Sequence, residues 1–191
     1  MRLIFYILIL LSVLLPQDQM FVGTRPLGMG GAFIAVADDG NTITWNPAGL
    51  PRLRRKEFTS SYADLYAMNI THSYAGVVWP FGDRIAIGFD WSNIGFDDQE
   101  LNYSENKLNF SLGYQPIKML SIGGTFKYLS RDMGLDGTSY GKTSGIGYDI
   151  GLLFSPFKKL RFGMSVYDLG GTDVTYKQNK VDETILGQAF K

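Results

Sequence analysis

The chain has 191 residues, which allows one domain with appendages, and its 18 basic and 18 acidic side chains give a formal net charge of zero. A neutral chain offers no electrostatic basis for binding nucleic acid, and the absence of cysteine excludes disulfides and thiolate chemistry. Its 23 glycines exceed the usual share of about 7%, which suits a curved sheet with many turns.

The chain begins with a segment typical of a secretory leader. Arg2 is followed by an almost uninterrupted apolar run over Leu3–Leu15, which Pro16 ends. This run fits the apolar core of a signal peptide and is shorter than the ~20 residues that a spanning helix needs. We therefore predict a signal peptide over residues 1–16, with an uncleaved anchor as the alternative, and export to the periplasm or the outer membrane.

Residues 17–56 form a turn-rich, apolar segment that we expect to be a plug. Gly28, Gly30 and Gly31 lie within four residues, which is unfavourable in a strand or a helix. The sequence Asn46-Pro47-Ala48-Gly49 is typical of a turn, because proline fixes φ and glycine permits a positive φ. A segment of this kind has to pack against another surface, and the lumen of the strands that follow is the candidate.

The same segment resembles the N-terminal signature of the PorV/PorQ family, within the wider FadL-like group of outer-membrane barrels. The resemblance is dense over about residues 23–50 and looser around Tyr148–Phe154 and Leu160–Gly163. It implies an all-β, antiparallel transmembrane barrel with an N-terminal plug, and more strands than this chain supplies. The residues that carry it, and that we predict to form the plug and line the lumen, are Gly28, Met29, Gly30, Gly31, Phe33, Asp38, Asp39, Trp45, Asn46, Pro47, Ala48 and Gly49.

From Glu57 onward, apolar and polar side chains alternate with a period of two, which is typical of strands with two unlike faces. The clearest case is Leu120–Tyr128. The pattern predicts about eight antiparallel strands in residues 57–191. They lie near residues 58–66, 71–79, 85–92, 108–114, 120–128, 146–154, 160–167 and 183–190.

The connections between these strands are predicted to alternate in length, as they do in outer-membrane barrels with short periplasmic turns and long external loops. Each short connection contains a proline and is followed, seven or eight positions later, by Gly88, Gly123 or Gly163. The short connections lie around Pro80, Pro116 and Pro156, and the long ones over residues 93–106, 131–144 and 170–182.

Aromatic residues are predicted to form two bands, one at each rim, as amphipathic rings do at membrane interfaces. We therefore predict that the protein lies in the bacterial outer membrane, with a soluble periplasmic β-protein as the alternative. The band at the short turns consists of Trp79, Phe81, Tyr114, Phe154 and Phe157, and the other of Trp91, Tyr128 and Tyr167.

Residues with catalytic or metal-binding chemistry are few. His72 is the single histidine, and without cysteine it does not make a usual zinc site, so we expect it at the surface. The sequence Asp38-Asp39-Gly40-Asn41 lacks the ligand spacing of a calcium loop and predicts a turn. The glycines at 28–31 lack the lysine of a phosphate-binding loop. We predict that the protein is not an enzyme and uses no cofactor or metal.

Two functions remain open from the sequence. The FadL-like resemblance implies binding and passage of hydrophobic small molecules across the outer membrane, with Met29, Phe33, Ile34 and Trp45 as an apolar surface for the ligand. The PorV resemblance implies a component of a type IX protein secretion system that binds exported proteins. The expected partners are outer-membrane lipid and either a hydrophobic ligand or an exported protein.

A barrel closed by about eight strands of this chain alone cannot also contain the predicted plug. An eight-stranded barrel is just wide enough for its own side chains and has no room for a plug of roughly thirty residues. We therefore expect an open, curved sheet with Glu57–Tyr66 and Glu183–Phe190 as unpaired edges and Leu27–Leu50 against its concave face. The rest of the wall would come from further strands or from another chain.

Overall fold

A computed structural model describes residues 23–65, 68–97, 101–135, 138–157, 159–169 and 175–177. The predicted signal peptide and the predicted strand at 183–190 lie outside these residues. Before the first strand come α2 (Thr24–Gly28), α3 (Thr42–Trp45) and the 3-10 helix η1 (Pro47–Arg52). None of the helices in the described ranges is long and apolar enough to cross a membrane.

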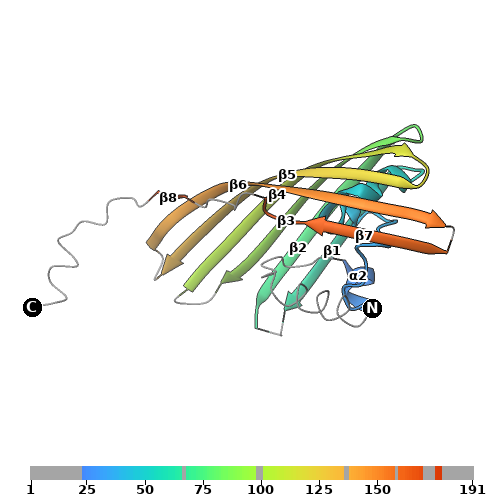
Figure 1. Ribbon diagram of the computed structural model, residues 1–191. Coiled ribbons are helices and arrows are strands. Elements are labelled where there is room, and N and C mark those ends of the chain that lie inside the picture. Colours follow the sequence, from blue (N-terminus) through green and yellow to red (C-terminus); the bar gives the residue numbers. More distant parts are fainter. Residues whose placement is uncertain are drawn as a thin grey trace, which may run out of the picture.

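The strands form one antiparallel sheet in which each strand from β1 to β7 pairs with the next along the chain, and β8 pairs with β6. Figure 1 shows this sheet curled like part of a barrel wall. Within the described residues this order ends at β1 and β7, so an open, curved sheet with β1 at one edge is confirmed there, and the other expected edge at Glu183–Phe190 stays a prediction. The strands are β1 (Glu57–Leu65), β2 (Ile70–Phe81), β3 (Ile85–Asp97), β4 (Leu101–Ile117), β5 (Leu120–Leu135), β6 (Thr138–Phe157), β7 (Leu160–Val166) and β8 (Thr175–Lys177).

The sheet is apolar on its outer face and polar on its inner face, which is the reverse of the arrangement in a soluble protein. Side chains that are neighbours in a strand point to opposite faces. On the convex, outer face Phe89 and Phe110 are 47% and 51% exposed, whereas on the inner face their neighbours Asp90 and Ser111 are both fully buried. An apolar outside around a polar inside is the pattern of transmembrane β-barrels.

The outer face changes from apolar to polar along a sharp line across four strands. The last apolar row consists of Trp91, Leu108, Tyr128 and Ile146, and the next outward-facing row of Asn93, Asn106, Ser130 and Ser144. The indole N–H of Trp91 donates to Asn106 Oδ1 at 3.3 Å, so this ring is apolar on one side and hydrogen-bonded on the other. The apolar part of the outer face lies between this line and the β2–β3, β4–β5 and β6–β7 turns, and we call it the apolar band. In β5 it runs from Leu120 to Tyr128, close to the about 9–11 residues of a tilted spanning strand.

The predicted long connections over residues 93–106 and 131–144 are wrong, because most of each is strand. β3 stays paired with β4 as far as Asp97, and β5 with β6 as far as Leu135. Outer-face positions there are polar and inner-face positions are mixed, so no clean alternation marks the strands in the sequence. The ends of the sheet still differ, since these hairpins continue past the apolar band. The predicted connection at 170–182 lies largely outside the described residues.

Most of the predicted rim aromatics lie on the outer face. Trp79 and Phe81 end the apolar band at the β2–β3 turn, and Trp91 and Tyr128 end it at the opposite side; all four are exposed. Tyr167 is wrongly placed by the sequence pattern. It follows the last residue of β7, and its hydroxyl donates to the backbone oxygen of the buried Trp45 at 2.5 Å.

The three tryptophans make this orientation testable. Trp79 and Trp91 are 45% and 38% exposed on the outer face. Trp45 is 2% exposed and lies on the concave side of the sheet. In vesicles whose acyl chains carry bromine near the headgroup, we expect strong quenching of Trp79 and Trp91 and little quenching of Trp45. Single-tryptophan variants, with the other two changed to phenylalanine, measure each one. Equal quenching of Trp45, or protection of the other two, would contradict the assigned faces.

Candidate functional site

Residues 23–56, which we call the inner segment, lie on the concave face of the sheet (Figure 1). Phe33, Trp45 and Ala48 are buried in one cluster with Leu153 of β6. The rings of Phe33 and Trp45 meet edge to face, with centroids 6.1 Å apart. A second cluster joins the inner segment to β2 and β3. It consists of Ile43, Leu50, Leu53, Val78 and Ala86.

Glycines on the inner face let the inner segment approach the strand backbones closely. A Cβ at Gly123 would overlap the carbonyl carbon of Pro47 and, at 2.5 Å, the nitrogen of Ala48. A Cβ at Gly151 would overlap the Asn46 side chain. The glycines that follow the proline turns in the sequence therefore have a physical reason, which is contact with this segment. Those with such close approaches are Gly88, Gly113, Gly123, Gly151 and Gly163.

Asn46 ties the turn to both the inner segment and the wall. Its Oδ1 accepts a hydrogen bond from the Ala48 N–H at 3.1 Å, which caps the start of η1. Its Nδ2 donates to the backbone oxygens of Ile34 at 2.9 Å and of Leu152 in β6 at 3.3 Å. The side chain is fully buried, so these three bonds hold the turn at one place on the sheet.

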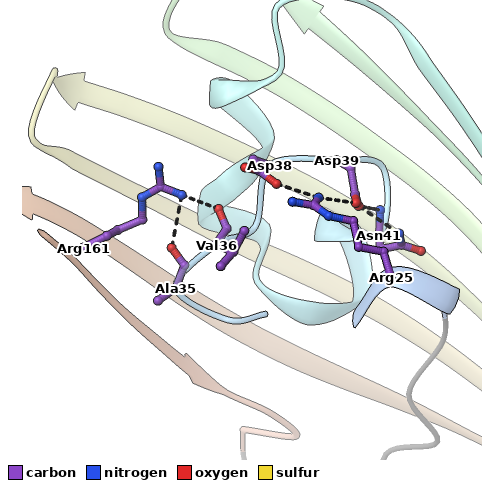
Figure 2. A network of polar contacts seen from close by, with 7 residues as sticks. All are labelled: Arg25, Ala35, Val36, Asp38, Asp39, Asn41 and Arg161. Carbon is purple, nitrogen blue, oxygen red and sulfur yellow. Dashed lines mark hydrogen bonds and ion pairs between the residues drawn. The ribbon is translucent and has the colours of Figure 1, made fainter. Parts of the chain in front are cut away.

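Asp38 and Asp39 of the inner segment pair with Arg25, and Asp39 also stabilises a turn (Figure 2). Arg25 Nη1 lies 2.7 Å from Asp38 Oδ1 and 2.6 Å from Asp39 Oδ2. These hydrogen bonds raise the pKa of Arg25 above its ordinary value. Asp39 Oδ1 also accepts from both the backbone and the side-chain N–H groups of Asn41, at 2.8 Å each. The described residues contain no group of three or more His, Cys, Asp or Glu that could hold a metal ion.

Other signature residues make less contact than the sequence suggests. Met29 is 38% exposed, and a Cβ at Gly28 or Gly30 would meet nothing within 4 Å. Gly30 and Gly31 have φ of 62° and 79°, a left-handed conformation that glycine adopts without strain. A Cβ at Gly49 would overlap the backbone of the inner segment itself, at the Ala37 oxygen.

The apolar ligand surface expected at Phe33 and Trp45 is not available in this structure. These side chains are 0% and 2% exposed, because they pack against each other and against the wall. Of the other two members of the expected surface, Met29 is exposed and Ile34 borders a cavity. This cavity of about 440 Å³ lies between the inner segment and β7, and it is also lined by Ala35 and Gly163.

Polar side chains on the inner wall form contacts that the sequence did not single out. The buried Asp90 accepts from Asn109 Nδ2 at 2.8 Å and from Thr44 Oγ1 of the inner segment at 3.3 Å. Buried His72 lies on the same face, so the expected surface position is wrong. The sequence signal that could have located these residues was the set of polar positions in each alternating strand, because those positions form the inner face.

A buried lysine lies farther along the same face. Lys127 Nζ is 2.8 Å from Asp149 Oδ1 and 2.5 Å from Asp168 Oδ1, and the Asp168 N–H donates to Asp149. Toward the long hairpins, Glu105 pairs with Arg131 at 2.6 Å. The wall thus presents paired charges to the lumen and apolar groups to the outside.

No protein-family model matches the chain, and no curated protein matches its sequence. In structure it is similar to a protein described as the CymD monoaromatic hydrocarbon channel, with a TM-score of 0.61 and 18% sequence identity. The match covers 80% of this chain and 54% of that one, so the chain spans about half of the channel's length. This likeness confirms the predicted fold class, an all-β, antiparallel barrel wall. The PorV/PorQ resemblance gains no support and stays a prediction.

Proposed function

We propose that the chain is part of an outer-membrane barrel that binds and passes small hydrophobic molecules without enzymatic chemistry. The observation that carries the proposal is the inverted polarity of the wall, with an exposed apolar band outside and buried, paired polar groups inside. The fold likeness to a protein named a hydrocarbon channel supports the same function.

In this proposal the three parts of the chain have separate roles. Residues 1–16 direct export, residues 17–56 act as a plug, and residues 57–191 supply strands of the wall. The clusters and close glycine contacts described above support a plug that rests against the wall. The apolar band and its polar boundary support a location in the bacterial outer membrane.

The path for a ligand runs beside the plug rather than through its core. Phe33 and Trp45 are packed too tightly to admit a ligand. The cavity of about 440 Å³ and a second one of about 560 Å³ both border Ala35 and residues of β7. A small apolar molecule that moves along this side meets Ile34 and Met164 on the way.

Uptake by cells tests the proposal. The full-length protein is expressed in a bacterial host that lacks its own channel for hydrophobic compounds. We expect uptake of labelled toluene to increase severalfold over the empty-vector host, and uptake of a labelled disaccharide to stay at the host level. Outer-membrane fractionation and heat-modifiable gel mobility confirm that the protein is in place. Unchanged toluene uptake with the protein assembled, or its recovery as a soluble periplasmic protein, would refute the proposal.

The alternative role as a component of protein secretion stays a prediction from the resemblance alone. None of the contacts described above favours an exported protein over a small molecule as the ligand. Co-purification of a defined exported protein with the barrel would be the result that favours it.

A further inference from the structure

A cavity of about 560 Å³ lies at the turn end of the sheet, between the inner segment and the β4–β5 and β6–β7 turns. We call it the turn-end cavity. The charged residues that line it are all basic: Arg52, Lys118, Lys159 and Arg161. A volume of this order is ordinary for a site that binds a small molecule or a headgroup.

The two arginines of the cavity have no carboxylate partner in the part of the chain that the structure describes. Arg52 Nη1 donates to Ser155 Oγ at 3.2 Å. Arg161 Nη1 donates to the backbone oxygens of Ala35 and Val36, at 3.3 and 2.6 Å (Figure 2). Burial lowers the pKa of Arg52 and the positive charge of Arg161 lowers it further, while the negative charge of Asp38 raises it by less. The half-buried Arg52 and the exposed Arg161 thus lie close enough for their positive charges to repel each other.

Other arginines of the inner segment differ in this respect. Arg25 pairs with Asp38 and Asp39, and Arg54 lies 2.9 Å from Asp83. Their charges are compensated within the chain. Asp38 attracts Arg52 only at longer range, and neither arginine of the turn-end cavity forms an ion pair among the described residues. Both guanidinium groups can therefore bind an anion from outside the chain.

The cavity is also continuous with the lipid-facing surface. Its lining includes Met119, Phe157 and Leu160, which are 43%, 71% and 44% exposed. Phe157 pairs with Leu160 across the β6–β7 hairpin, and the stacked rings of Phe154 and Phe162 follow on the outer face. An anionic group in the cavity could therefore be joined to an apolar chain that lies along the apolar band.

We propose that the turn-end cavity binds the phosphate headgroup of an anionic phospholipid from the membrane leaflet at the turn end. Arg52 and Arg161 hold the phosphate oxygens, since guanidinium groups bind phosphate through paired hydrogen bonds. Lys118 and Lys159 add positive charge at the rim, and the acyl chains lie along Leu160 and the band. The proposal requires the membrane location but not the passage of hydrocarbons.

Native mass spectrometry of the purified full-length chain with phosphatidylglycerol or phosphatidylcholine tests this site. We expect the protein to retain phosphatidylglycerol in preference. The variant Arg52→Gln/Arg161→Gln is expected to bind it roughly tenfold or more weakly, because it loses the charged hydrogen bonds to the phosphate. The matched control is Arg54→Gln/Arg55→Gln, which removes the same charge from exposed side chains outside the cavity lining. Its affinity is expected to stay within about twofold.

Each contrary outcome overturns the site. Equal weakening in both variants would mean that surface charge alone attracts the lipid, and no weakening in either would mean that the cavity binds none. Binding of inorganic phosphate that displaces the lipid at millimolar concentration would identify a free anion as the ligand. If Arg52→Gln/Arg161→Gln loses heat-modifiable mobility, Lys118→Gln/Lys159→Gln decides. We expect that variant to keep its fold and to bind the lipid more weakly, and unchanged binding would refute the site.

Discussion

Replacing Gly123 with valine is expected to drive the inner segment away from the wall, whereas replacing the adjacent Gly124 is expected to leave it in place. A side chain at Gly123 meets the backbone of Pro47 and Ala48, which cannot rotate out of the way. Overpacking of this kind costs about 1–3 kcal/mol or more. At the upper end of that range, the displaced state becomes roughly 100-fold more populated.

A single cysteine at Ala48 reports this change, because the natural chain has no cysteine and Ala48 is fully buried. In the Ala48→Cys background, labelling by a maleimide should be slow, and Gly123→Val should accelerate it by up to about 100-fold. Gly124→Val is the control, since a Cβ there has only the Asp149 backbone oxygen nearby, at 3.7 Å. Equal labelling of the two valine variants would show that the inner segment does not depend on the glycine contacts.

The second large effect is expected from Lys127→Met, which should destabilise the wall by about 3–5 kcal/mol. Lys127 is 4% exposed, and its amine lies between Asp149 and Asp168. Without it, Asp149 remains as a carboxylate that is 5% exposed and has lost its ion-pair partner. Urea-induced unfolding in lipid vesicles, followed by tryptophan fluorescence, measures the loss.

Two further variants separate this effect from a general loss of charge. Adding Asp149→Asn to Lys127→Met should restore a large part of the stability, because it removes the buried charge. Lys142→Met removes an exposed partner of Asp132, where the side chains are 76% and 41% exposed, and should cost less than about 1 kcal/mol. Similar losses for the two lysines, or no recovery in the double variant, would argue against a buried ion pair that supports the wall.

The sequence by itself determined the strands of the apolar band and, in the strands with the clearest alternation, the face each side chain occupies. β7 was predicted at 160–167 and ends at Val166, and β1 was predicted at 58–66 and spans Glu57–Leu65. This works because side-chain alternation along a strand is local and has a fixed period of two. It fails past the apolar band, where the polar outer face of β3–β6 removes the contrast between the faces.

Only the tertiary structure decided which residues meet across the lumen. The glycine spacing after each proline turn was visible in the sequence, but not that Gly123 faces the backbone of Pro47. Nor could spacing show that Lys127 meets Asp168, or that Arg52 and Arg161 share a cavity without a carboxylate. These contacts depend on the register between strands and on the curl of the sheet. Both are set by packing between segments far apart in the chain, which a local pattern does not encode.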